Sequence, residues 1–137
     1  MIKRILVLPL ALIALFTATF ILYANREFTP AISGPNSIAS METVRLGGVE
    51  QFVLLRGEDA RKPLLLILHG GPGAPVTPLV RKYNSGLEKH FVVVNWDQRG
   101  GGKSNTEAVA ADSLTIDQHQ ADTIQLIEYL LKRIGQQ

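Results

Sequence analysis

The chain has 137 residues, of which 46% are hydrophobic, 19% are charged and none is cysteine, and its formal net charge is +2. A chain this apolar is not intrinsically disordered. The lack of cysteine excludes disulfides, a thiolate nucleophile and a zinc–thiolate site. Without residues 1–26 the remainder carries 11 basic and 12 acidic residues, so we expect no nucleic-acid partner. The length allows one domain and not two.

Residues 5–24 form an uninterrupted run without a charged side chain. As a helix the run would be about 30 Å long, which matches the hydrocarbon core of a bilayer. Lys3 and Arg4 precede it, which favours a cytoplasmic N-terminus and a body beyond the membrane. The sequence therefore predicts a single-pass anchor in residues 1–26, with membrane lipid as its partner. The alternative is a cleaved signal segment that releases a secreted body, although the apolar part of such segments is usually about 7–15 residues long.

Residues 27–42 contain proline, glycine and several serines, and we expect them to link the membrane segment to a folded body at 43–137. Gly47-Gly48 between two alternating segments is typical of a hairpin turn. Two later continuous apolar runs favour strands that are buried on both faces. Four strands are therefore expected, at residues 43–46, 49–56, 64–68 and 91–96.

The helices are expected at residues 77–88 and 116–134, with a glycine-rich loop at 97–105 and a loop or short helix at 106–113. Thr115, with Gln118 three residues later, forms a capping-box pattern at the start of the last helix. Gly135 suits the position just past its end. Apolar residues recur along this segment at helical spacing: Ile116, Ile124, Ile127, Leu130, Leu131 and Ile134. Strand, helix, strand and helix in this order predict an α/β fold with a parallel sheet.

The first motif that could carry chemistry is Leu-His-Gly-Gly-Pro-Gly at residues 68–73, directly after a predicted buried strand. Its glycines allow a tight turn and a close approach of the backbone. Exposed amide hydrogens in such a turn are suited to stabilising an oxyanion. A plain glycine-proline turn is the alternative for this segment taken alone.

The second motif is Asn-Trp-Asp-Gln-Arg-Gly-Gly-Gly-Lys-Ser at residues 95–104, again directly after a predicted strand. As a structural loop, it could be held by a contact between the Asp97 carboxylate and the Arg99 guanidinium. Its Gly-Lys-Ser end also matches the tail of a phosphate-binding loop. That pattern requires glycine five residues before Gly102, where this chain has Asp97. A carboxylate facing a phosphate is electrostatically unfavourable, which disfavours nucleotide binding.

Together the two motifs resemble the proline iminopeptidase branch of the α/β-hydrolase superfamily. In that family a His-Gly-Gly-Pro-Gly turn follows the third strand and an Asp-Gln-Arg-Gly-x-Gly-x-Ser loop follows the fourth. The resemblance covers residues 43–135. It implies a sheet with two antiparallel first strands and parallel later strands, and hydrolysis of peptides or esters by acyl transfer. It implies no metal and no organic cofactor.

The resemblance also implies a role for each matched residue. The backbone amide of Gly71 would form half of the oxyanion hole, supported by Gly70. His69 would hold the turn and would not be the catalytic base. The residues that would have structural roles in the two motifs are His69, Pro72, Gly73, Asp97, Gln98, Arg99, Gly100, Gly102 and Ser104.

Enzymes of this family also need a Gly-x-Ser-x-Gly elbow, followed by an acid and a histidine. Ser104 comes nearest, but Thr106 stands where the second glycine is required. His90 and His119 do not sit where the family places its base. We therefore expect the chain to be the N-terminal portion of a membrane-anchored serine hydrolase, cut short by a frameshift, an early stop or a gene-calling error. It would be inactive as it stands, and only a complete version would act on a peptide or ester substrate.

In the family's usual strand order the third strand lies beside the fifth. The resemblance therefore implies that, without a fifth strand, the apolar run at 64–68 would lie at the edge of the sheet, an arrangement that native folds avoid. This leaves open a non-catalytic, membrane-tethered binding module whose sheet is completed by a partner strand. The third hypothesis is a nucleotide-binding protein, which Asp97 disfavours because it stands where the phosphate-binding loop requires glycine.

Overall fold

The computed structural model describes residues 12–22, 28–70 and 73–136, and residues 12–22 are helical. Within these ranges no helix is both long enough and apolar enough to cross a membrane. The other residues of the predicted 5–24 segment lie outside the described part of the chain, so the membrane anchor stays a prediction.

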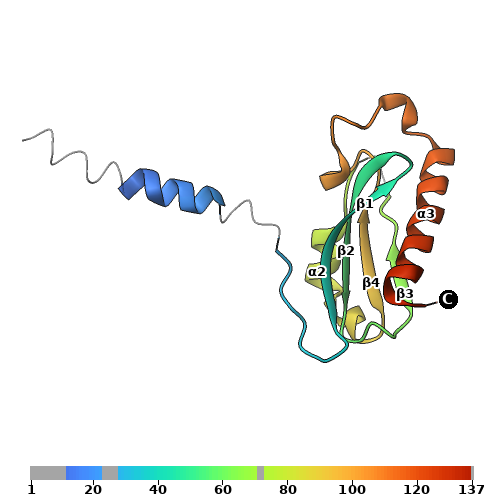
Figure 1. Ribbon diagram of the computed structural model, residues 1–137, viewed down its shortest axis with the longest axis horizontal. Helices are drawn as coiled ribbons and strands as arrows, with labels where there is room; N and C mark the ends of the chain where they lie inside the picture. Colours follow the sequence, from blue (N-terminus) through green and yellow to red (C-terminus); the bar gives the residue numbers. More distant parts are fainter. Residues whose placement is uncertain (1–11, 23–27, 71–72, 137) are drawn as a thin grey trace, which may run out of the picture.

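The folded body is built on a single sheet with the strand order β1-β2-β4-β3 (Figure 1). Strand β1 pairs with β2 and β2 pairs with β4 in antiparallel fashion, whereas β3 and β4 are parallel. The predicted antiparallel hairpin followed by parallel strands is therefore confirmed, and the fold is a mixed α/β sheet with helices. The strands are Ile38–Leu46 (β1), Val49–Gly57 (β2), Leu64–Ile67 (β3) and Val92–Asp97 (β4).

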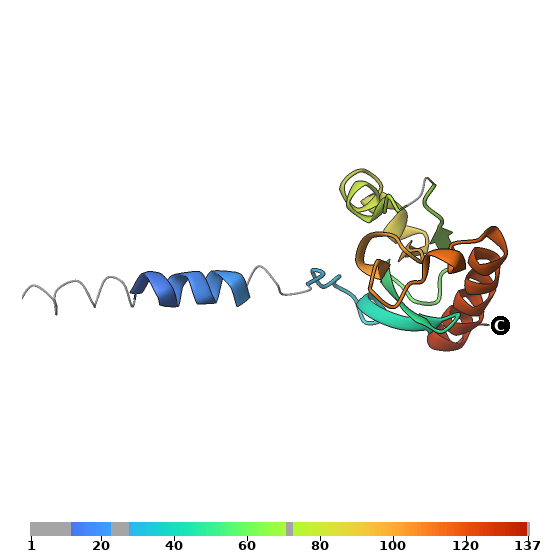
Figure 2. The ribbon, with the colours of Figure 1, turned by 90° about the horizontal axis from the view of Figure 1, so that it is seen from above.

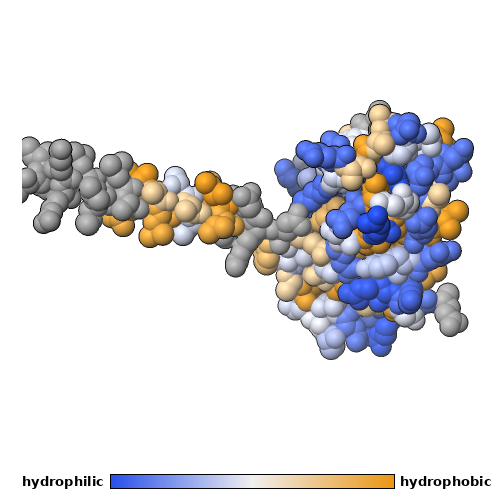
Figure 3. All heavy atoms as spheres, turned by 45° about the horizontal axis from the view of Figure 1, so that its top comes forward, coloured by the Kyte–Doolittle hydropathy of each residue, from blue (hydrophilic) through white to orange (hydrophobic). Residues whose placement is uncertain are grey.

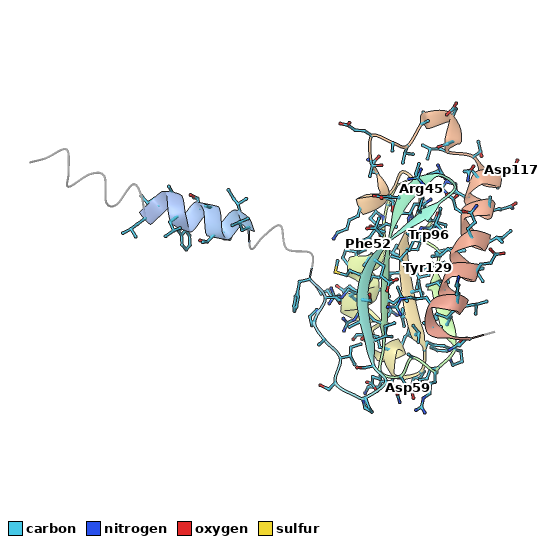
Figure 4. The ribbon with its side chains drawn as sticks, viewed as in Figure 1. Arg45, Phe52, Asp59, Trp96, Asp117 and Tyr129 are labelled. Carbon is cyan, nitrogen blue, oxygen red and sulfur yellow. The ribbon has the colours of Figure 1, made fainter. Side chains whose placement is uncertain are left out.

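Helices lie on opposite faces of the sheet, with α2 (Thr77–Tyr83) on one face and α3 (Ile116–Ile134) on the other (Figure 2). Because side chains alternate along a strand, every second residue of β2 and β4 points toward α3. These residues, with Leu126 and Leu130 of α3, form the main core. Trp96 of β4 is buried in this core, and the partly buried Tyr129 of α3 packs against it (Figure 4). The core members are Val44, Leu46, Val53, Leu55, Val92, Val94, Trp96, Leu126 and Leu130.

Strand β1 begins at Ile38, five residues before the predicted start, so part of the segment expected to be linker belongs to the sheet. Its first residues pair with the end of β2, from Ile38 opposite Gly57 to Glu42 opposite Val53. The glycine, proline and serine residues that favoured a linker end at Ser37, apart from Ser40. Ser40 is tolerated in the strand because its hydroxyl donates to the Glu42 carboxylate at 2.7 Å.

The helix predicted at 77–88 is broken into two pieces. Helix α2 ends at Tyr83, and the 3₁₀ helix η1 (Ser85–Lys89) follows it. Asn84 separates them with non-helical backbone angles, and Ser85-Gly86 are weak helix formers. The 3₁₀ turn η2 (Gly102–Ser104) lies in the segment predicted to be a glycine-rich loop. A second one, η3 (Ala111–Ser113), lies in residues 106–113, for which the sequence predicts a loop or a short helix.

Helix α3 has the predicted bounds. The Thr115 side chain accepts a hydrogen bond from the backbone N–H of Gln118, and Gly135 follows the helix in the left-handed conformation. Its recurring isoleucines do not all face the core, because Ile116, Ile124 and Ile127 are exposed. The core face of α3 instead carries a buried carboxylate, Asp122, beside the two core leucines. The helix therefore has a second apolar face that nothing in the described chain covers.

Strand β3 lies at the edge of the sheet in the described part of the chain, as the family resemblance implies. Its four residues are only half-buried, and Leu68 directly after it is 55% exposed. An apolar edge of this kind can pair with a further strand. The open edge of β3 and the exposed isoleucines of α3 are thus two surfaces that lack a partner in the described structure.

Candidate functional site

The two sequence motifs lie next to each other at one end of the strands. Because β3 and β4 are parallel neighbours, their carboxyl ends lie side by side, and each motif directly follows one of these ends. Ligand sites of open α/β sheets form outside the carboxyl ends of strands. Sequence spacing alone predicted both loops, and the sheet topology brings them together.

A pair of reciprocal hydrogen bonds joins the loops. The backbone N–H of Gln98 donates to His69 Nε2 at 3.0 Å, and the Gln98 side-chain amide donates to the His69 carbonyl at 3.1 Å. An Nε2 atom that accepts from an N–H carries no proton, so His69 is the neutral tautomer with its proton on Nδ1. That Nδ1 is buried and has no hydrogen-bond partner among the described residues. In this arrangement the imidazole holds the loops together.

The expected oxyanion turn is described only at its two ends. Gly70 is exposed after β3, and Gly73 lies beyond it in a turn. Gly71 and Pro72 fall outside the described residues, so the role expected of the Gly71 amide stays a prediction. A hollow of about 290 Å³ lies beside this turn. Its lining consists of His69, Gly73, Gln98, Arg99, Gly100, Leu114 and His119.

Asp97 organises the second loop and does not pair with Arg99 as the sequence reading suggested. Its Oδ1 accepts from the Thr77 hydroxyl at 3.2 Å, and its Oδ2 accepts from the backbone N–H of Lys103 at 3.0 Å. The Asp97 carbonyl accepts from the Ser104 hydroxyl. The buried carboxylate therefore connects the start of α2 to the glycine-rich loop. Local spacing could not reveal Thr77, which is 20 residues away in the sequence.

Arg99 instead forms a buried ion pair with Asp122 of α3. Arg99 Nε lies 2.8 Å from Asp122 Oδ2, and Nη2 lies 3.1 Å from Oδ1. Nη2 also donates to the carbonyls of Leu46 and Gly47 at the β1–β2 turn. One guanidinium thus fixes the hairpin, the loop after β4 and the helix α3 relative to one another. Sequence reasoning missed Asp122, although a carboxylate between apolar positions of an amphipathic helix was a usable signal.

Two glutamines complete the hydrogen bonds of this carboxylate. Gln51 Nε2 donates to Asp122 at 2.7 Å, and Gln118 Nε2 donates at 2.8 Å. The Gln51 carbonyl oxygen accepts from the Trp96 indole at 3.0 Å. Burial alone would raise the pKa of Asp122, but the hydrogen bonds from Arg99, Gln51 and Gln118 and the charge of Arg99 outweigh it and lower the pKa. Asp122 is therefore an ionised structural carboxylate.

Two glycines of the second loop are required by the backbone and by close contacts. Gly100 and Gly102 have φ values of 74° and 49°, a region that costs other residues conformational energy. A Cβ on Gly100 would lie 2.9 Å from a Leu114 methyl group. A Cβ on Gly102 would lie 2.8 Å from Pro75 Cγ and closer still to the Asp97 carboxylate. The loop can therefore pack tightly against both neighbours.

The Gly-Lys-Ser end of this loop does not have the geometry of a phosphate-binding loop. Gly102, Lys103 and Ser104 form the 3₁₀ turn η2 and are not the start of an α-helix. The Ser104 hydroxyl is fully buried, and it accepts from the Phe52 N–H at 2.8 Å while donating to Asp97. Its hydrogen-bonding capacity serves the fold. The nucleotide-binding hypothesis therefore receives no support from this geometry.

The site has no nucleophile of the expected type, because none of the 137 residues forms a Gly-x-Ser-x-Gly motif. His119, expected at a helix face, lines the hollow beside the turn, and its Nδ1 is buried without a partner in the described structure. Among residues 12–22, 28–70 and 73–136, no group of three or more His, Asp or Glu side chains could hold a metal ion.

Comparison with known proteins gives two informative matches, and no protein-family model matches the chain. Over 95 residues, which are 69% of this chain and 30% of the relative, the sequence is 45% identical to the probable aminopeptidase YbaC of Bacillus subtilis (strain 168). The fold is similar to the crystal structure of the proline iminopeptidase-related protein TTHA1809 from Thermus thermophilus. That match has a TM-score of 0.60 and 33% identity, and covers 68% of this chain and 32% of the other.

The chain thus spans 30% of the length of the curated relative and 32% of the solved structure that it matches. Both comparisons fit the resemblance carried by the two motifs. They show that the chain is similar to part of a probable aminopeptidase and to part of a proline iminopeptidase-related structure.

Proposed function

We propose that this chain supplies the N-terminal part of a serine hydrolase domain of the α/β-hydrolase superfamily, similar to proline iminopeptidases. The observation that carries the proposal is the reciprocal bonding of His69 and Gln98. It joins the two family-like motifs at the carboxyl ends of β3 and β4. The 45% identity to a probable aminopeptidase over the matched segment supports it further.

In this proposal the Gly71 amide donates a hydrogen bond to the oxygen that becomes negative when a serine attacks a peptide or ester carbonyl. His69 and Gln98 hold the turn, and the Asp97 and Arg99 contacts fix the loop behind it. The serine, its general base and the acid that orients the base would come from residues other than these 137. The present chain would then bind the developing charge without forming an acyl-enzyme.

The open edge of β3 and the uncovered isoleucines of α3 support the same proposal. A further strand beside β3 would satisfy the free backbone groups of Leu64–Ile67. The segment leading to and following such a strand would cover Ile124 and Ile127. The exposed apolar surface is therefore what the first part of a larger sheet would present.

A serine-directed fluorophosphonate probe tests where the nucleophile lies. We expect no labelling of the 137-residue chain. We expect labelling of a chimera in which this chain's matched segment replaces the corresponding segment of the Bacillus subtilis relative. Peptide mapping should place the label on a serine outside the transplanted segment. Labelling of any serine within the 137 residues would overturn the assignment.

We further propose that residues 5–24 anchor the protein in a membrane, with the N-terminus cytoplasmic and the body on the other side. The support is the charge-free run behind Lys3 and Arg4. Large apolar side chains in its helical part are exposed, including Phe16 and Leu22 at 71%. Retention in the membrane after alkaline carbonate extraction is the expected result. A secreted product that lacks the charge-free run would show signal cleavage instead.

A further inference from the structure

The segment at residues 28–37, called the tether here, is bound firmly to the body. Arg56 of β2 donates from Nη1 to the Thr29 hydroxyl and to the Pro30 carbonyl, the latter at 2.7 Å. The same guanidinium pairs through Nε with Glu88 of η1 at 2.8 Å, and its side chain is 9% exposed. At the other end of the tether, the Asn36 carbonyl accepts from the Ala60 N–H at 2.8 Å. The tether is therefore held to the body near both of its ends.

The tether and α2 border the same hollow. A hollow of about 450 Å³ is lined by Phe28 of the tether, by Pro78 and Arg81 of α2, and by sheet residues between them. Three large apolar side chains are exposed on these two segments: Phe28 at 71%, Leu79 at 58% and Tyr83 at 69%. Figure 3 shows apolar residues gathered where the chain joins the body. We call Phe28, Leu79, Arg81, Lys82 and Tyr83 the tether face.

Charge is distributed unevenly over the body. Residues 73–91, which contain α2 and η1, carry three basic residues and one acidic residue, Glu88, which Arg56 already engages. Residues 104–131 carry five acidic residues and no lysine or arginine. On the tether face, Lys82 Nζ lies 5.1 Å from the centre of the Tyr83 ring. The tether face is thus basic and aromatic, whereas the segment leading into α3 is acidic.

We propose that the tether face docks on an anionic lipid surface. Tyrosine, phenylalanine, lysine and arginine together are typical of side chains that sit at a membrane interface, with apolar parts inserted and charges at the headgroups. Basic residues near an anionic leaflet are attracted within about one Debye length. The inference rests on the proposed anchor at residues 5–24, since this anchor would hold the clamped tether within a few residues of the bilayer. The high local concentration would make a weak surface contact effective.

The experiment uses the full chain, which has no native cysteine, in vesicles of phosphatidylcholine with or without phosphatidylserine. A fluorophore is placed on Leu79→Cys in the tether face, and on Ala108→Cys in the acidic segment as a matched exposed control. Quenching by a nitroxide-headgroup lipid is measured. We expect at least twofold stronger quenching at position 79 than at 108 in the anionic vesicles. The excess should disappear in about 1 M salt, where the Debye length is about 3 Å, and in a variant carrying Arg81→Gln and Lys82→Gln.

Flotation of the same samples separates this inference from the anchor. If the chain floats with vesicles in about 1 M salt but positions 79 and 108 are quenched equally in anionic vesicles at low salt, docking is wrong and the anchor stands. If it floats only with anionic vesicles at low salt, with position 79 quenched, docking stands and the anchor is wrong. Failure to float under any condition overturns both. Protection of position 79 from lipid and aqueous quenchers alike would show that protein covers the face, which also overturns docking.

Discussion

Arg99 and Asp122, 23 residues apart in the sequence, form a two-point ion pair in the interior, with N–O distances of 2.8 and 3.1 Å. Their side chains are 2% and 0% exposed. Removal of one partner would leave the other charge buried and uncompensated, which typically costs about 3–5 kcal/mol. We therefore expect Arg99→Ala to lower the free energy of unfolding by about that amount, measured by denaturant titration of the full chain.

The exposed pair Arg61–Asp59 is the matched control, because its arginine side chain is 75% exposed. Exposed ion pairs contribute about 0–1 kcal/mol, so Arg61→Ala should change the free energy of unfolding by less than about 1 kcal/mol. Equal effects of Arg99→Ala and Arg61→Ala would contradict the role assigned to Arg99.

Low pH should lower the free energy of unfolding through protonation of the Asp122 carboxylate. The hydrogen bonds of Asp122 lower its pKa below the ordinary value near 3.8. Its stabilising contribution is therefore fully present above that ordinary value and is lost as the pH falls through the lower folded pKa. Between about pH 5 and pH 2, the wild-type unfolding free energy should fall more steeply than that of Asp122→Asn. Parallel curves for the two proteins would show that Asp122 does not contribute to the acid dependence.

Gly102→Ala should destabilise the loop after β4. The backbone is left-handed at this position, and a Cβ would press on Pro75 and on the Asp97 carboxylate. We expect a loss of about 1–3 kcal/mol in thermal unfolding experiments. Gly86→Ala is the control, since a Cβ there meets nothing within 4 Å. Gly86→Ala should be neutral or slightly stabilising. A loss of stability as large as that of Gly102→Ala would show that the close contacts of Gly102 are not the cause.

The two apolar faces of α3 should respond differently to substitution. Leu126 is fully buried, so Leu126→Ala should cost about 2–5 kcal/mol in denaturant unfolding. Ile124 is 59% exposed, so Ile124→Lys should change stability by less than about 0.5 kcal/mol. The same lysine should reduce concentration-dependent self-association in sedimentation experiments, because the exposed face becomes charged. Severe destabilisation by Ile124→Lys would show that this face is packed in solution.

Local features could be predicted from the sequence because neighbouring residues determine them. The start of α3 follows from the hydroxyl of Thr115 and its end follows from Gly135, both of which act within one helical turn. The two strand-loop motifs were likewise recognisable as short patterns, and their family resemblance predicted the antiparallel-then-parallel sheet.

Long-range pairing could not be predicted in the same way. Closeness in sequence favours Asp97 as the partner of the Arg99 guanidinium, yet packing places Asp122 beside it. The buried Gln51 that joins Asp122 to Trp96 gave no local signal at all. The expected oxyanion amide of Gly71 lies outside the described residues, so that part of the candidate site still rests on resemblance.

The most direct test of the central claim is the hydrolysis rate of the chimera with the Bacillus subtilis relative, measured on a panel of aminoacyl p-nitroanilides that includes proline. Removal of a single oxyanion donor typically costs about 10²–10³ in kcat. If this segment supplies the sheet and the oxyanion turn, a folded chimera should therefore keep kcat within about 10-fold of the relative. A chimera that unfolds at the same temperature as the relative but has lost about 100-fold or more in kcat would contradict the account.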